Sequence, residues 1–103
     1  GKRRIHKRPY QVEINACRPW LQAEIDAISP KVLVCLGVTA ASSVFSRRVR
    51  LSDYQDRIVS SPLSKQTLVT THPAAIVRIR EESPRHARYA AFVDALRLAA
   101  ERV

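Results

Sequence analysis

The sequence predicts an α/β fold, because helical patterns alternate with short apolar runs along the chain. Two runs carry most of this prediction. Residues 32–36 are continuously apolar, and residues 67–71 are β-branched and apolar, as expected of strands that are buried on both faces. The first run continues through Gly37 directly into a helical pattern over residues 37–45, and such a strand–helix unit is typical of α/β proteins.

A long helix is expected before the first strand. In residues 10–28, apolar side chains recur at three- and four-residue spacing, which is the helical period. Pro19 lies in the middle of this segment and removes one backbone donor. We therefore expect either a kink at Pro19 or two short helices, with Pro19 in the first turn of the second.

The last helix is expected over residues 84–102, with Ser83 as its N-cap and Pro84 in its first turn. Its predicted core-facing stripe consists of Tyr89, Phe92, Val93, Leu96 and Ala100. Residues 58–59 are a candidate for a short additional strand. Since two strong strands make a marginal sheet by themselves, we expect further strands and a helix layer from a segment outside these residues.

The charge of the chain is strongly positive. Its 103 residues include 18 Lys and Arg against 9 Asp and Glu, a net charge of +9. Such an excess attracts polyanions, and nucleic acid is the first candidate, with a basic surface that merely keeps the protein in solution as the alternative. The charge is densest in residues 1–9, which lack apolar periodicity and are interpreted as a basic loop, so the domain divides into this loop and an α/β portion over residues 10–103.

Two further observations concern location. No apolar run approaches the roughly 20 residues that span a bilayer, so no membrane partner is expected. Cys17 and Cys35 do not make a disulfide framework. We therefore expect a reducing, cytoplasmic location.

His72 is the first candidate for chemistry. It follows the predicted strand over residues 67–71, and ligands of open α/β sheets bind outside the carboxyl ends of the strands. Pro73 fixes the backbone after it and biases His72 toward an extended conformation. A rigidly held imidazole there can donate a hydrogen bond to developing negative charge. A histidine that only packs at the strand end is the equally weighted alternative.

The basic loop and the segment after His72 supply the other candidates. In the loop, cations bind phosphate, and they also favour a neutral His6 at pH 7, which can act as a nucleophile. A solvated basic tail with an incidental histidine is the alternative. Residues 74–80 combine apolar side chains with Arg78 and Arg80, and so could wedge into a base stack or extend into the core.

Four segments together resemble the uracil-DNA glycosylase superfamily, its family 4 and 5 branches most broadly. Residues 17–21 (CRPWL) are similar to a Cys-x-Pro-aromatic-Leu segment of that family, and residues 30–40 (PKVLVCLGVTA) to its Pro-Lys-Val strand and turn. Residues 70–74 (TTHPA) resemble the His-Pro-Ser motif, with Ala74 in place of Ser. Residues 2–6 (KRRIH) resemble the inserted loop of the UdgX-type enzymes. Each motif is weak alone, whereas their order and spacing are specific.

The resemblance implies half of a three-layer α/β/α sandwich with a mainly parallel central sheet. It also implies an enzyme that flips deoxyuridine out of DNA, excises uracil and becomes covalently linked to the resulting sugar. His72 would hydrogen-bond uracil and His6 would capture the sugar. Lys2, Arg3, Arg4 and Arg78 would bind DNA. A glycosylase of ordinary family 4 or 5 type that turns over, and a non-catalytic basic DNA-binding fragment, are the alternatives.

The resemblance also implies parts that these residues lack. Cys17 matches one of four ligands of a [4Fe–4S] cluster, and one ligand cannot hold a cluster. The other ligands, and the loop and side chains that read uracil, belong to the N-terminal half of the family's domain. We therefore expect this chain to be the C-terminal half, competent only with that N-terminal half as its partner, and monomeric when complete.

Overall fold

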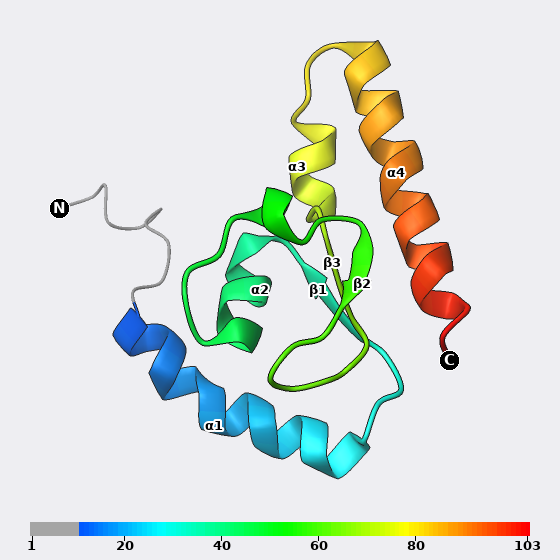
Figure 1. Ribbon diagram of the computed structural model, residues 1–103. Helices are drawn as coiled ribbons and strands as arrows, with labels where there is room; N and C mark the ends of the chain where they lie inside the picture. The colour runs from blue at the N-terminus through cyan, green and yellow to red at the C-terminus, as the bar shows by residue number, and fades with distance from the viewer. Residues whose placement is uncertain (1–10) are drawn as a thin grey trace, which may run out of the picture.

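The computed structural model describes residues 11–103 (Figure 1). The basic loop predicted for residues 1–9 lies outside these residues. The elements in chain order are α1 (Gln11–Ile28), β1 (Leu33–Leu36), α2 (Val38–Phe45), a 3₁₀ turn η2 (Leu51–Asp53), β2 (Arg57–Val59), β3 (Thr67–Thr70), α3 (Pro73–Val77) and α4 (Glu82–Ala100). The alternation of helices and strands confirms the predicted α/β class.

The sheet has the order β1–β3–β2 in the described part of the chain. β1 pairs with β3 in parallel, from Leu33 opposite Thr67 to Leu36 opposite Thr70. The predicted short strand is present as β2 and pairs with β3 in the antiparallel direction. Helices cover both faces: Cys35 and Val69 pack with residues of α2, whereas Leu68 packs with Ala95 and Ala99 of α4. These are the helix, sheet and helix layers of an α/β/α arrangement (Figure 1).

The two main strands differ in burial, which corrects one prediction. All four residues of β3 are buried, as expected. In β1 only Cys35 is buried, while Val34 and Leu36 remain 38% and 37% exposed. The reason is positional: α4 packs on β2 and β3, so the side chains of the edge strand β1 that face the same way lie beyond its reach.

α1 is a single helix through Pro19, so the alternative of two short helices is wrong. Ile14 and Ile25 are buried on either side of Pro19, and Pro19 itself is exposed. Tertiary packing of the two ends therefore holds α1 in one piece, although proline removes a backbone donor inside it.

α4 begins earlier than predicted. Glu81, in an extended conformation, is its N-cap, and the Arg85 N–H donates to the Glu81 carbonyl at 3.2 Å. Ser83 therefore lies inside the helix. The buried face of α4 also differs from the predicted stripe. Tyr89 is 59% exposed, while Ala95 and Ala99 are buried against the sheet. The face of α4 that packs on Leu68 of β3 is therefore the one with small alanine side chains, although the larger apolar residues form the more obvious pattern.

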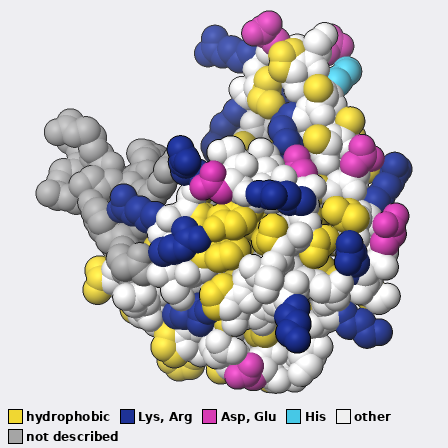
Figure 2. All heavy atoms as spheres, viewed as in Figure 1, with side chains coloured by type: hydrophobic (Ala, Val, Ile, Leu, Met, Phe, Trp, Pro, Cys, Tyr) yellow, Lys and Arg dark blue, Asp and Glu magenta, His cyan; other side chains and the backbone are white. Residues whose placement is uncertain are grey.

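Lys and Arg side chains are scattered over the face shown in Figure 2 rather than gathered at one point, and hydrophobic side chains lie exposed between them. None of the helices within residues 11–103 has the length and hydropathy that crossing a lipid bilayer requires.

Candidate active site

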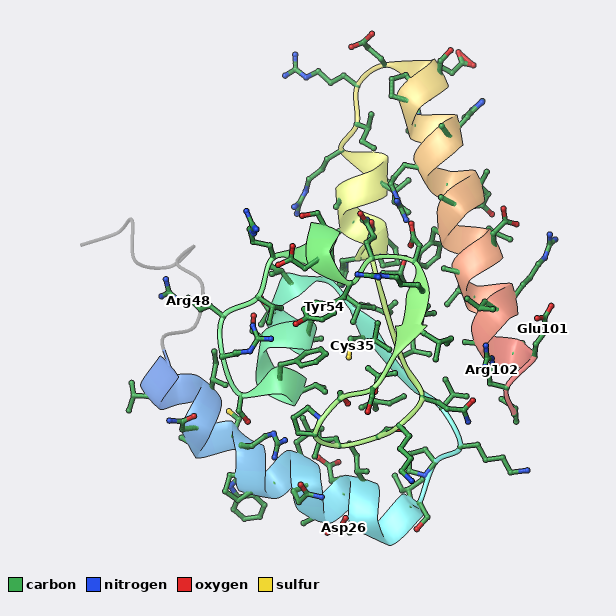
Figure 3. The ribbon with its side chains drawn as sticks, in the orientation of Figure 1. Asp26, Cys35, Arg48, Tyr54, Glu101 and Arg102 are labelled. Carbon is green, nitrogen blue, oxygen red and sulfur yellow. The ribbon has the colours of Figure 1, made fainter. Side chains whose placement is uncertain are left out.

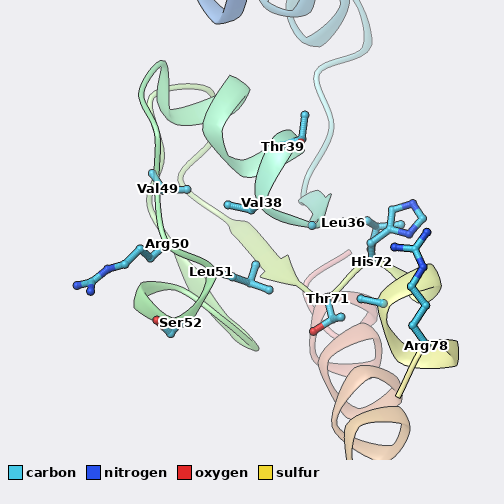
Figure 4. A pocket seen from close by; sticks show the side chains of 12 residues that line it. Leu36, Val38, Thr39, Val49, Arg50, Leu51, Ser52, Thr71, His72 and Arg78 are labelled. Atoms are coloured by element: carbon cyan, nitrogen blue, oxygen red, sulfur yellow. The ribbon is translucent and has the colours of Figure 1, made fainter. Parts of the chain in front are cut away.

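A cleft of about 710 Å³ opens at the carboxyl ends of β1 and β3 (Figure 4). One wall is the turn from β1 into α2, a second is the segment around η2, and the third is the passage from β3 into α3. Among the residues that line the cleft are Leu36, Gly37, Arg50, Thr71, His72 and Arg78. The ends of two parallel strands thus form the crevice where ligands of open α/β sheets bind.

His72 lies in this cleft, directly after β3, as its position in the sequence predicted. Its backbone is extended (φ −70°, ψ 137°), the conformation favoured before proline, and it is the N-cap of α3. The Ala74 N–H donates to His72 Nδ1 at 3.0 Å. A neutral imidazole that accepts at Nδ1 carries its hydrogen on Nε2. On this exposed ring, Nε2 is therefore the nitrogen that is left to donate a hydrogen bond.

Gly37 brings the two strand ends together. Its N–H donates to the Thr70 carbonyl at 2.8 Å, and its φ of +93° is a conformation that glycine adopts easily. A Cβ at this position would lie 3.2 Å from His72 Cβ. Gly37 is not among the site residues that the sequence predicts, although a glycine between a strand and a helix is a signal for such a position.

For residues 74–80 the sequence left two interpretations open, a wedge into a base stack or an extension into the core, and different residues of the segment fit each of them. Ile76 is buried and extends the core, whereas Val77, its neighbour, is 75% exposed. Arg78 follows α3 and lines the cleft with His72, while Arg50 stands on the opposite wall with its side chain directed away (Figure 4). The structure therefore brings together two of the predicted site residues, His72 and Arg78.

Comparison with known proteins identifies the family. Residues 2–97 match the family model described as the uracil DNA glycosylase superfamily. The chain belongs to this superfamily. A curated relative, the type-4 uracil-DNA glycosylase of Pyrobaculum aerophilum, is 29% identical to it. The match covers 71% of this chain and 41% of the relative, so the chain spans well under half of that glycosylase.

Four residues that the superfamily resemblance singles out lie outside the described residues. They are Lys2, Arg3, Arg4 and His6. Their roles, and any proximity to His72, stay predictions.

The two cysteines of this superfamily member differ sharply. Cys17 is exposed on α1 and lines a separate cavity of about 390 Å³ with Trp20 and Leu21. Cys35 lies in the interior between α2 and the sheet (Figure 3), and burial raises the pKa of its thiol from 9.0 to about 11. Cys35 is thus a protonated thiol at neutral pH and packs with Ala41 and Val44 of α2.

An iron–sulfur cluster, which the resemblance implies, needs several thiolate ligands close together. Within residues 11–103 no three His, Cys, Asp or Glu side chains come together as metal ligands. Cys17 offers one exposed thiol, whereas a [4Fe–4S] cluster takes four. These residues by themselves therefore do not fit the cluster.

Proposed function

We propose that the protein containing this chain excises uracil from DNA. The observation that carries the proposal is the His72 imidazole in the wall of a cleft at the end of β3, with Nδ1 bonded to the Ala74 N–H so that Nε2 is left to donate. Membership of the uracil-DNA glycosylase superfamily and the similarity to a type-4 uracil-DNA glycosylase support the substrate class.

Excision breaks the bond between C1′ of the flipped deoxyuridine and N1 of uracil. The electron pair leaves with uracil, so negative charge spreads onto its carbonyl oxygens while the sugar gains oxocarbenium character. A hydrogen bond from His72 Nε2 to that uracil anion stabilises the transition state more than the ground state. Because Nδ1 is already occupied by the Ala74 N–H, the ring does not need to reorient during the reaction.

The sugar cation is then captured by His6. An imidazole nitrogen forms a bond to C1′, the ring loses its remaining N–H proton, and the uracil anion takes up a proton. The products are a histidine–DNA adduct and free uracil, so atoms and charge balance. The KRRIH sequence of residues 2–6 supports this covalent form, and the 29% identity to a type-4 uracil-DNA glycosylase supports the alternative in which water captures C1′.

DNA is held by the cations Lys2, Arg3 and Arg4 and by Arg78. The net charge of +9 supports this role, because cations that neutralise phosphates supply most of the sequence-independent affinity for DNA. The exposed Val77 beside Arg78 is suited to enter the space left by the flipped base.

We also propose that an N-terminal half of the domain completes the site, and that the complete protein is a monomer. The exposed apolar side chains Trp20 of α1 and Val34 and Leu36 of β1 support a packing partner, since Trp20 and Val34 line one cavity and a contiguous exposed apolar patch marks an interaction surface. That half would supply the residues that read uracil. It would also supply the three ligands that join Cys17 in holding an iron–sulfur cluster.

The test uses the whole protein and single-stranded DNA with one uracil. The wild type should release uracil and give a protein–DNA band that survives denaturation. His6→Ser should abolish the band, and His72→Asn should slow excision about 100- to 1000-fold. His86→Asn is the matched control, because His86 is exposed on α4 away from the cleft and should leave both readouts unchanged.

Three outcomes would contradict parts of the proposal. A band that persists in His6→Ser excludes His6 as the nucleophile. Uracil release without any band supports the turnover alternative. DNA binding with a steep salt dependence, without uracil release, supports a non-catalytic basic DNA-binding fragment.

A further inference from the structure

A partly buried ion pair between Arg88 and Asp56 contacts Thr70, the last residue of β3, two positions before His72. Arg88 of α4 donates from Nη2 to Asp56 Oδ1 at 2.9 Å. The Thr70 hydroxyl donates to the same Asp56 oxygen at 2.7 Å and lies 3.4 Å from Arg88 Nη2. Thr70 is fully buried, and the Arg88 and Asp56 side chains are only 21% and 25% exposed. The three side chains form a closed hydrogen-bonded triangle that links α4 to the end of β3.

The backbone around Asp56 strengthens this link. Asp56 has φ +63°, a conformation that costs free energy for a residue other than glycine, and its N–H donates to the Val69 carbonyl at 2.7 Å. Gln55 Nε2 donates to the Thr71 hydroxyl at 2.7 Å. Residues 55–56 therefore hold each of residues 69–71, the three residues that lead to His72.

Arg85, one helical turn before Arg88, binds the other end of the same segment. Its Nη1 donates to the carbonyl oxygens of Ile79 at 3.1 Å and Arg80 at 3.3 Å. The segment that carries His72 and Arg78 is thus attached to α4 at both ends, at Thr70 before His72 and at residues 79–80 after Arg78.

α4 also carries an ion pair of the ordinary kind. Arg97 and Asp94 lie 3.7 Å apart, with side chains 75% and 74% exposed, and such pairs contribute little to stability. The Arg88–Asp56 pair differs because it is partly buried, bonded to a third group and attached to the segment that forms the cleft.

We propose that Arg88, Asp56 and Thr70 form a positioning network that aims His72 at the leaving base. This rests on the proposed uracil excision. None of the three residues lines the cleft, so they act through β3 and not by touching DNA. A hydrogen-bond donor is effective only when it is held close to the geometry of the transition state, so loosening the network should slow bond breakage and leave DNA affinity unchanged.

Thr70→Val is the most specific variant, because it keeps the shape of the side chain and removes only the hydroxyl. In single-turnover reactions of the whole protein with uracil-containing single-stranded DNA, it should lower the rate constant about 10- to 100-fold. The dissociation constant for DNA should stay within about two-fold. Thr70→Ser, which keeps the hydroxyl, should restore most of the rate. Asp94→Ala is the matched control and should behave as the wild type.

A Thr70→Val protein that excises uracil at the wild-type rate overturns the proposal, as does an equal loss in Thr70→Ser. Since Thr70 is fully buried, Arg88→Met supplies the same test at the outer end of the network if Thr70→Val does not fold. Slower excision at unchanged DNA affinity supports the network, and a wild-type rate overturns it.

NMR separates this proposal from the proposed function. If the wild type leaves uracil in DNA, the proposed function fails, whereas the imidazole ¹⁵N–¹H correlations of His72 still report its position. Shifts of these signals in Thr70→Val, but not in Thr70→Ser or Asp94→Ala, support the network. Unchanged signals in all three variants overturn it.

Discussion

β1 and β3 look alike in sequence but differ in what surrounds them. β3 is central in the described sheet, with all four residues buried and partners on both sides. β1 lies at the edge and leaves Val34 and Leu36 exposed. His72 follows β3, the strand whose end is held by Gly37, by residues 55–56 and by α4. The difference teaches that the candidate site is built on the most constrained strand of the fold.

The largest expected effect comes from Leu68→Ala in β3. Leu68 is fully buried between the sheet and α4, so its truncation should lower the free energy of unfolding of the chain by about 2–5 kcal/mol. The same change at Leu36 in β1 should cost less than about 1 kcal/mol, because that side chain already contacts water. Urea denaturation of both variants measures the contrast, and equal losses would show that β1 is as buried as β3.

Gly37→Ala tests the place where the two strand ends meet. The positive φ and the 3.2 Å approach of the added Cβ to His72 Cβ should together cost about 1–3 kcal/mol. Thermal unfolding measures this cost. The imidazole signals of His72 should shift as well, and a variant with unaltered stability and signals would contradict the close contact.

The pH dependence of the unfolding free energy tests the burial of Cys35, the one buried residue of β1. The pKa of Cys35 is raised by burial from 9.0 to about 11, so between these values the unfolded chain binds fewer protons at this thiol than the folded one. Its contribution to stability is thus complete below pH 9 and is lost as pH rises toward 11. Cys35→Ala should flatten the pH dependence of the unfolding free energy in this window, and an unchanged slope would refute the assignment.

The reactivity of the two thiols gives a second test of the burial of Cys35, with the exposed Cys17 as the comparison. Iodoacetamide at pH 8 should modify the exposed Cys17 and spare Cys35 in the folded chain. Mass spectrometry of the digested protein identifies the modified residue, and urea-unfolded chain, in which both cysteines react, is the control.

The smallest expected effect is that of Val34→Thr. Val34 is 38% exposed on the edge strand, so a hydroxyl there remains in contact with water and the unfolding free energy of the 103-residue chain should change by less than about 0.5 kcal/mol. Val69→Thr, at a fully buried position of β3, is the matched comparison and should cost clearly more.

Much of the fold follows from local patterns. Helical spacing predicted α1 and a helical pattern after Gly37 predicted α2, whereas continuous apolar and β-branched runs predicted the two main strands. The start of α4 was predicted two residues late, since Ser83 and Pro84 resemble a helix start that Glu81 provides instead. The burial of β1 was also predicted wrongly, because an apolar run does not reveal whether its strand is central or at an edge.

The sequence by itself determined the α/β class, the position of His72 after a strand and its extended backbone before Pro73, because these depend on neighbouring residues. Only the tertiary structure decided which strand is central, that Gly37 approaches His72, and that the cationic side chain of Arg88 turns inward to Asp56. Those features join residues far apart in the chain, 32 positions apart for Arg88 and Asp56. Such pairings follow from the packing of α4 on the sheet, which no local pattern encodes.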